Sequence, residues 1–339
     1  MNKWKSHMGL PSLQELFLNC KTRLSFMNSA FNLYGILACF LLSLSGMQAQ
    51  TLEDPEPHFI LLGIAQDGGY PHIGCDRQCC SPARADDGMR RYVASGALVD
   101  PESGTWWLID ATPDIGAQLA LFRDLTDGAY PMVPEGILLT HAHMGHYTGL
   151  MQLGVEALNT KSVAVYAMPR MATFLGTNGP WSQLVAYENI VLNTVVADST
   201  VVLNKRVSFI PISVPHRDEF SETVGFRLIT SAKSYLYLPD IDKWHKWDRN
   251  LEDELESVDV AFLDGTFYTQ NELPYRNINT IPHPLVVETI SQLSAYPPEV
   301  TSKVVFFHFN HTNPLLWIEA VRTKIEGEGF QAGQQGKRY

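Results

Sequence analysis

The sequence predicts an α/β fold whose folded domain covers residues 51–339. Apolar segments with the length of strands alternate along the chain with segments of helical spacing. Two segments, 258–263 and 303–309, are largely apolar, which is typical of strands buried on both faces. The composition, with 45% hydrophobic and 18% charged residues, is that of an ordinary globular protein with enough apolar material for a core.

The expected elements follow from local patterns. Residues 93–100 and 105–109 flank the turn-forming sequence Pro101-Glu102-Ser103-Gly104 and therefore predict two paired strands. The other expected strands are 59–63, 136–140, 162–167, 195–203, 207–211, 223–229, 234–238, 258–263 and 303–309. Helical spacing predicts helices over 115–125, 147–158, 285–294 and 315–327. The intervals 168–183 and 244–254 are expected to be loops that form walls of a pocket.

Residues 1–50 have the character of an export signal. Lys21 and Arg23 precede an apolar run over 31–44, and Ala49 supplies a small residue for cleavage. We therefore expect a periplasmic or secreted protein without a membrane span after cleavage. An N-terminal anchor is the alternative, although the run is shorter than the ~20 residues that a spanning helix needs. A faint lipoprotein cleavage box that ends at Cys39 is a further alternative.

The charge of residues 51–339 restricts the class of partner. This part of the chain contains 21 Lys and Arg against 35 Asp and Glu, a formal charge of -14. Such a surface repels a phosphate backbone, so a long nucleic acid is disfavoured as a partner. A small-molecule substrate, even an anionic one, is compatible with this negative charge, because a bound metal ion can dominate the electrostatic field at the site.

Three of the eleven histidines lie within six positions, at His141, His143 and His146, directly after the expected strand 136–140. Sites in α/β proteins gather at the carboxyl ends of strands. Neutral imidazole is a strong metal ligand, and a catalytic zinc site needs about three protein ligands and one open position. The cluster therefore predicts part of a metal site.

Four other segments place a ligand-type side chain just after a strand or turn. These residues are His216, Asp240, Asp264 and His308, with Asp242 as a near alternative to Asp240. Because strand ends converge on one rim in an open α/β arrangement, residues distant in sequence can meet there. We expect them to join the histidine cluster.

The cysteines that remain after removal of the signal are Cys75, Cys79 and Cys80. One interpretation is a structural zinc site, with His72 close enough to be the fourth ligand. The alternative for an exported chain is a disulfide from Cys75 to Cys79 or Cys80 that leaves one free thiol.

The motif His141-Ala142-His143-Met144-Gly145-His146 resembles the metallo-β-lactamase superfamily, whose signature is His-X-His-X-Asp-His. The resemblance covers about residues 58–320. It implies a four-layer αβ/βα sandwich, in which two mixed sheets lie face to face with helices outside and metal at one edge. It also implies the ligand sets: His141, His143 and His216 would hold one metal, His146 and His308 a second, and Asp240 would bridge the two.

Within the superfamily, other segments are similar to the pyrroloquinoline quinone biosynthesis protein B branch. They are Gly68-Gly69-Tyr70-Pro71, Ala111-Thr112-Pro113-Asp114-Ile115, His146-Tyr147-Thr148-Gly149-Leu150, Asp264-Gly265-Thr266 and His308-Phe309-Asn310-His311-Thr312-Asn313-Pro314. That branch and related phosphodiesterases carry a cysteine-rich structural zinc loop near the N-terminus, which supports metal at the three cysteines.

Gly145 departs from the signature. In two-metal relatives the aspartate at this place ligates the second ion, and glycine has no side chain to do so. We therefore expect one firmly bound ion and a second that is weak, absent or completed by water. Zinc is the expected ion, and iron or manganese also suit such ligands.

The expected function is metal-dependent hydrolysis of a small-molecule ester, with a phosphodiester as the favoured substrate, through a metal-bound water whose pKa is lowered toward ~7. Asp240 would ligate the metal or orient this water. By resemblance to phosphodiesterases, His283 would donate to the oxyanion or leaving group, and Asp264 would support a ligand histidine. Two alternatives stay open: a non-hydrolytic role in quinone cofactor maturation, by metal-dependent oxidation or as a carrier, and a degenerate binding protein.

Overall fold

The computed structural model describes residues 55–274, 276–277 and 280–339. The expected export signal lies outside the described residues. Among the residues that are described, no helix has both the length and the apolar character that crossing a membrane requires.

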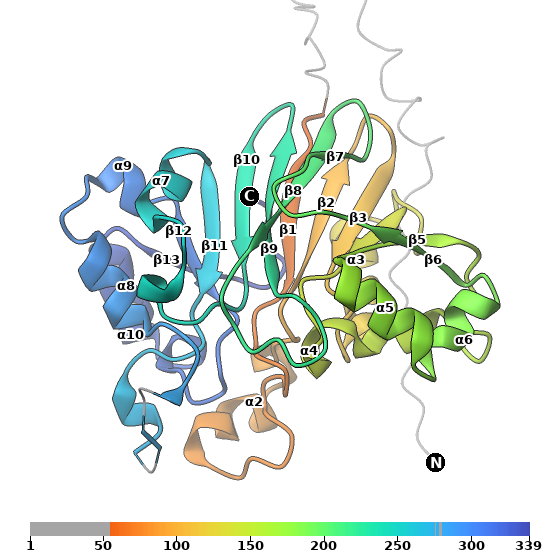
Figure 1. Cartoon of the computed structure of the whole chain (residues 1–339). Helices are drawn as coiled ribbons and strands as arrows, with labels where there is room; N and C mark the ends of the chain where they lie inside the picture. Colours follow the sequence, from red (N-terminus) through yellow and green to blue (C-terminus); the bar gives the residue numbers. More distant parts are fainter. Residues whose placement is uncertain (1–54, 275, 278–279) are drawn as a thin grey trace, which may run out of the picture. The chain divides into compact units, whose positions relative to one another are not determined.

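Two mixed sheets form the centre of the fold (Figure 1). The first sheet has the order β1-β2-β3-β4-β5-β6, in which β1 to β3 are antiparallel and β3 to β6 are parallel. Its strands are β1 (His58–Gly63), β2 (Ser95–Asp100), β3 (Thr105–Ile109), β4 (Gly136–Leu138), β5 (Val163–Ala167) and β6 (Ile190–Thr194).

The second sheet has the order β13-β12-β11-β10-β9-β8-β7. Strands β7 to β10 are antiparallel and β10 to β13 are parallel, so both sheets combine an antiparallel and a parallel part. Its strands are β7 (Val201–Val202), β8 (Val207–Ser213), β9 (Val224–Thr230), β10 (Ser234–Leu238), β11 (Val260–Asp264), β12 (Val304–Phe307) and β13 (Gln331–Ala332).

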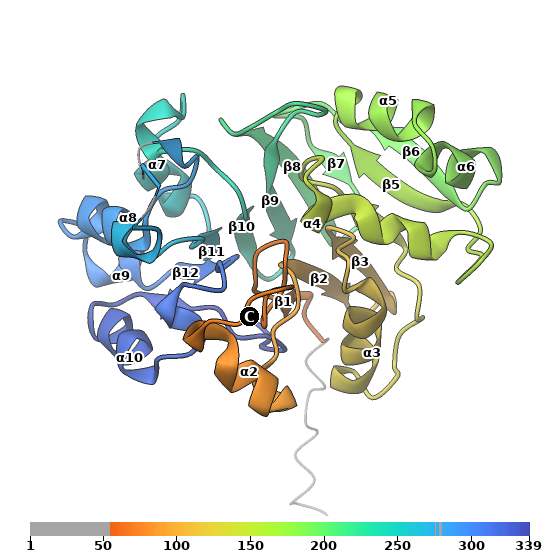
Figure 2. The same ribbon diagram turned by 90° about the horizontal axis from the view of Figure 1, so that it is seen from below.

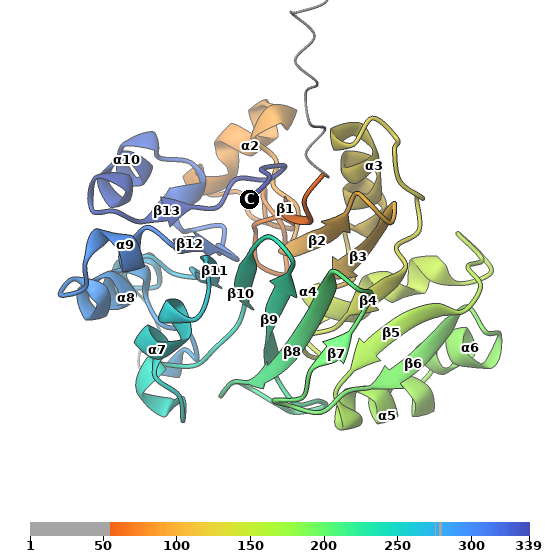
Figure 3. The same ribbon diagram turned by 90° about the horizontal axis from the view of Figure 1, so that it is seen from above.

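Helices cover the outer face of each sheet, as Figures 2 and 3 show from opposite sides. On the first sheet these are α3 (Ile115–Leu125), α5 (Pro169–Thr177) and α6 (Trp181–Ala186). On the second they are α7 (Leu251–Glu256), α8 (Val286–Leu293) and α10 (Glu319–Gly327), with the short α9 (Pro298–Thr301) beside them. The predicted four-layer αβ/βα sandwich is therefore confirmed.

Aromatic side chains fill the space between the sheets. Phe59 of β1 is fully buried, and its ring centroid lies 4.7 Å from that of Phe262, 5.7 Å from Tyr235 and 5.9 Å from Tyr237. These three partners belong to the second sheet. Large aromatic rings bury much apolar surface and favour tilted contacts at such distances. This cluster fixes the sheets against each other and so fixes the rim where their strands end.

The predicted helix over 147–158 is wrong. The structure has a four-residue helix, α4 (Met144–Tyr147), followed by a 3-10 helix, η3 (Thr148–Leu153). The amide of Gly149 donates to the carbonyl of Ala111 at 2.9 Å instead of continuing an α-helix. A Cβ on Gly149 would lie 2.0 Å from the carbonyl oxygen of Thr112, so the close approach requires glycine here.

The predicted strand over 195–203 is also wrong. Strand β6 ends at Thr194, just before this range, and only the two-residue β7 falls within it. Between them the chain turns: Ser199 donates to the carbonyl of Val196 at 3.2 Å, and Asp198 has a φ of 62°. Aspartate tolerates this left-handed conformation better than most residues. The expected loops 168–183 and 244–254 instead contain α5, the start of α6 and part of α7.

The packing of Phe59 between the sheets predicts that Phe59→Ala strongly lowers the stability of the fold. Removal of a fully buried ring that joins the two sheets should lower the free energy of unfolding by about 3–5 kcal/mol, measured by urea denaturation. Ile73→Ala is the control, because Ile73 is 82% exposed and its truncation should change stability by no more than about 0.5 kcal/mol. Equal effects in the two variants would contradict this description of the core.

Candidate metal centre

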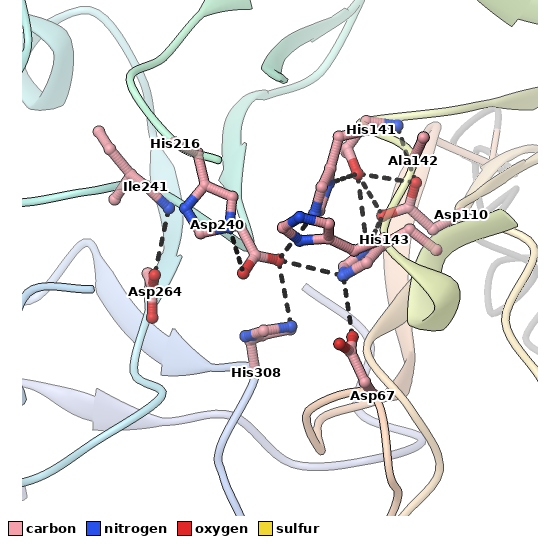
Figure 4. Close-up of polar contacts among 12 residues, drawn as sticks. Asp67, Asp110, His141, Ala142, His143, His216, Asp240, Ile241, Asp264 and His308 are labelled. Carbon is pink, nitrogen blue, oxygen red and sulfur yellow. Dashed lines mark hydrogen bonds and ion pairs between the residues drawn. The ribbon is translucent and has the colours of Figure 1, made fainter. Parts of the chain in front are cut away.

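The predicted site residues converge at one rim of the sandwich, at the ends of strands from both sheets (Figure 4). His141 follows β4 in the first sheet. His216, Asp240 and His308 follow β8, β10 and β12 in the second. The structure thus brings together imidazoles that are far apart in the sequence.

The first histidine group consists of His141, His143 and His216. One ring nitrogen from each lies within 4.8 Å of the others, a separation that one metal ion can span. Asp240 faces this group: its Oδ1 is 3.5 Å from Nε2 of His216, and its Oδ2 is 3.8 Å from Nε2 of His141.

The second group consists of His146, His308 and Asp67. Oδ2 of Asp240 is 3.1 Å from Nε2 of His146 and 3.2 Å from Nε2 of His308. Oδ1 of Asp67 is 3.4 Å from the same nitrogen of His146. Asp240 therefore stands between the two groups, as the resemblance implied. Asp242 does not compete for this place, because its Oδ2 pairs with Lys246 at 2.6 Å.

Matching hydrogen bonds orient one imidazole in each group. Thr140 donates its hydroxyl to Asp110 at 2.9 Å, so the same oxygen is free to accept from Nδ1 of His141 at 3.0 Å. Thr266 donates to Asp264 at 2.7 Å and accepts from Nδ1 of His308 at 3.0 Å. In each case the carboxylate orients the threonine hydroxyl, and the hydroxyl oxygen holds the proton on Nδ1. Nε2 therefore keeps its lone pair, which is the form of histidine that binds metal.

Asp110 also supports His146 directly, with Oδ2 2.8 Å from Nδ1. Asp110 and His308 have φ values of 62° and 58°, in the left-handed region. That conformation costs a residue with a side chain about 1–2 kcal/mol. Aspartate tolerates this conformation better than histidine does, so the backbone strain at the rim falls mainly on His308.

The donor set fits a metal. Several buried polar atoms at the rim form no hydrogen bond with the described residues, although they approach one another closely. They are Oδ1 of Asp67, Oδ2 of Asp240, Nε2 of His141, His146 and His308, and both ring nitrogens of His216. Buried polar atoms without partners are costly. A cation held between these converging atoms would explain why they lack hydrogen-bond partners.

Burial sets the charge state of the first histidine group. It lowers the pKa of His216 to about 4 and holds the pKa of His141 well below its usual value, with the nearby His146 acting in the same direction. Both rings are therefore neutral at neutral pH. Burial alone would raise the pKa of Asp240, but His308, His146 and His141 together hold it well below its usual value.

His283 lies beside the first histidine group. Its ring centroid is 5.2 Å from that of His216, and its Nδ1 is 2.7 Å from Oδ2 of Asp264. Burial would lower the pKa of His283, but Asp264, together with Asp240 and Asp67, raises it on balance. Asp264 therefore supports His283 directly and the predicted ligand His308 through Thr266. It also accepts from the amide of Ile241 at 3.2 Å, which positions the segment after Asp240.

A separate cysteine group is formed by Cys75, Cys79, Cys80 and His311. Nδ1 of His311 is 3.5 Å from Sγ of both Cys79 and Cys80, and the three cysteines are free thiols. His72, the expected fourth ligand, directs Nδ1 to the carbonyl of Ile73 at 2.7 Å and packs its ring against His311. The structure therefore replaces His72 with His311 in this group, because the loop after β12 reaches the cysteines.

Three residues of these groups were not anticipated from the sequence: Asp67, Asp110 and His311. Asp67 sits in a Gly-rich sequence that reads as a simple turn. Asp110 directly follows β3, much as Asp264 is the last residue of β11, so its position at a strand end was an available signal. His311 lies in a segment that carries the resemblance, but its contact with cysteines more than 230 positions away left no local pattern that marks it as a ligand.

Comparisons with known proteins agree with this architecture. The profile of the family described as "Beta-lactamase superfamily domain" matches residues 105–309. Coenzyme PQQ synthesis protein B of Methylobacterium sp. (strain 4-46) is 25% identical over 299 residues, which cover 82% of this chain and 97% of that protein.

Two solved structures share the fold. The crystal structure of Zn(2+)-bound PqqB from Methylobacterium extorquens has a TM-score of 0.66 and 23% identity, and covers 83% of this chain and 99% of that one. A diphosphatase from the PhnP family has a TM-score of 0.59 and 22% identity, and covers 84% of this chain and 97% of that one.

The cysteine group predicts that His311 and His72, whose rings pack together, differ in their effect on zinc content. If zinc binds there, His311→Ala should lose one zinc per chain, because its nitrogen faces two thiols, whereas His72→Ala should keep the wild-type count. Elemental analysis of the two purified proteins measures this. Loss of zinc in His72→Ala with retention in His311→Ala would contradict the assignment.

Proposed function

Because this chain belongs to the β-lactamase superfamily, we propose that it is a metal-dependent hydrolase of a small-molecule ester, with phosphodiesters as the favoured substrate class. The observation that carries the proposal is the buried Asp240 carboxylate between two groups of unpartnered ligand atoms. A zinc ion held there would act as a Lewis acid and supply a water with a pKa of about 7.

The residues of the chain would divide the remaining tasks. Asp240 would ligate metal and accept a hydrogen bond from the attacking water. His283 is held at Nδ1 by Asp264, so its Nε2 would donate a proton to the leaving oxygen. The raised pKa of His283 favours the protonated form that this task needs. The burial of Asp240, His141 and His216 keeps bulk water from competing for the ligands.

A pocket beside the first histidine group favours an organic ester over a bare inorganic anion. The pocket has a volume of about 420 Å³ and is lined in part by Phe174, Phe220 and Glu219. Glu219 contacts His143 at 3.4 Å, and the rings of Phe174 and Phe220 are stacked with centroids 5.3 Å apart. A planar organic group could pack against these rings while its ester linkage lies at the metal centre. The fold shared with a diphosphatase is compatible with hydrolysis at phosphorus.

A second candidate is a non-hydrolytic role in quinone cofactor maturation. The similarity to coenzyme PQQ synthesis protein B extends over 97% of that protein's length, which favours it. A degenerate binding protein is the third candidate. The three differ in metal content and turnover: zinc with hydrolysis supports the first, iron without hydrolysis the second, and protein that binds no metal the third.

The hydrolase proposal predicts turnover of bis(p-nitrophenyl) phosphate by the zinc-loaded protein. His283→Ala should lower kcat by about 10²–10⁴-fold, the usual contribution of a general acid, with zinc content unchanged. Asp240→Asn should lower both zinc content and turnover. His245→Ala is the matched control, because this exposed histidine lies outside the metal groups and its loss should change neither. Absence of turnover in zinc-loaded wild type on phosphodiester and carboxylester probes would overturn the proposal.

A further inference from the structure

Gly145 and Asp67 occupy one another's space. A Cβ built on Gly145 would lie 2.1 Å from Oδ1 of Asp67 and 2.8 Å from its Cα, distances that no real side chain tolerates. Position 145 is the place at which the His-X-His-X-Asp-His signature has its aspartate. The carboxylate of Asp67 therefore fills the volume into which a side chain at position 145 would extend.

Backbone hydrogen bonds connect the turn that carries Asp67 to the segment of His308, a member of the second group. Asp67 follows β1, and the amide of the preceding Gln66 donates to the carbonyl of Phe309 at 2.8 Å. Phe309 in turn donates to the carbonyl of Ile64 at 2.8 Å. Since Phe309 is the neighbour of His308, these bonds hold the turn and the histidine in a fixed relation. Figure 4 shows Asp67, Asp240 and His308 pointing toward one another.

The carboxylate is aimed into the site. Oδ1 of Asp67 is buried, forms no hydrogen bond with the described residues, and is 3.4 Å from Nε2 of His146. It belongs to the same group of possible ligand atoms as His146 and His308. Hard divalent cations and zinc both accept carboxylate oxygen, and an unpaired buried oxygen beside two imidazole nitrogens is suited to one.

We propose that Asp67 is a ligand of a second metal position, together with His146, His308 and Asp240, and that glycine at position 145 makes room for it. The ligand lost from the signature is supplied from a different element of the fold. This proposal rests on the proposed function in taking the rim to be a metal centre. It replaces the expectation that the second ion is weak, absent or completed by water.

The first test is Asp67→Asn, which keeps the size of the side chain and removes its charge. The full-length protein is saturated with zinc, freed of excess metal and analysed for zinc per chain, with affinities measured by competition with a chelator. We expect one zinc fewer than wild type, or a second zinc weakened by at least about 100-fold, the upper end of the loss caused by removing a supporting residue. An unchanged count and affinity overturns the proposal.

The matched control is Asp242→Asn. Asp242 lies two residues from Asp240 but pairs with Lys246, so its zinc count should equal that of wild type. An equal loss in Asp242→Asn and Asp67→Asn would mean that the effect is general to negative charge near the rim, and this too overturns the proposal.

The second test exchanges the two residues. Gly145→Asp alone should lose zinc, because its side chain collides with Asp67. Asp67→Gly combined with Gly145→Asp should recover the wild-type count, after a small shift of the turn at residue 67. Circular dichroism and thermal melting of each variant report whether it folds. If Gly145→Asp does not fold, Asp67→Asn decides the proposal by itself.

Zinc counting and hydrolysis separate this proposal from the proposed function. A wild-type protein that holds the second zinc through Asp67 but cleaves no ester would refute the hydrolase and leave the ligand standing. Zinc content that is unchanged in Asp67→Asn, in a protein that cleaves phosphodiester, would refute the ligand and leave the hydrolase standing.

Discussion

The buried carboxylate of Asp240 faces imidazole nitrogens from both halves of the fold, and the arrangement of the rim depends on this contact. Its two oxygens lie 3.1–3.8 Å from nitrogens of His141, His146, His216, His283 and His308. A charge in such a place is stable only with compensation, because removing it from water costs several kcal/mol. Burial would lower the pKa of His146, but Asp110, Asp240 and Asp67 raise it, so a protonated His146 offsets part of this charge. A divalent cation shared with the imidazoles would offset it from several ligand atoms at once.

The scaffold positions these groups by the same device on both sides. Each sheet contributes an aspartate at the end of a strand, Asp110 after β3 and Asp264 at the end of β11, and each aspartate accepts from a threonine that fixes a histidine. The aromatic packing around Phe59 holds the sheets together, so the two sets of ligands keep their separation. The positions of the ligand atoms are therefore set by the packing of the two sheets as well as by the loops that carry them.

The sequence predicted the parts of the fold and site that depend on local pattern. Apolar runs located most strands, and ligand-type residues directly after them located His141, His216, Asp240 and His308. The helix expected over 147–158 failed because Gly149 packs against the backbone near Thr112, a tertiary contact that helical spacing does not report. Asp67 and His311 were missed for the same reason, since each reaches its group from an element remote in sequence.

In the proposed arrangement, Asp240 joins two cation positions, one of them completed by Asp67. The most direct measurement is a crystal structure of the zinc-loaded protein with anomalous diffraction recorded at the zinc absorption edge. Two zinc peaks are expected at the rim. One should lie about 2.0–2.2 Å from ligand atoms of His141, His143 and His216, the other at such distances from His146, His308 and Asp67, with Asp240 contacting both. A single peak, or a second peak that Asp67 does not touch, would contradict this arrangement.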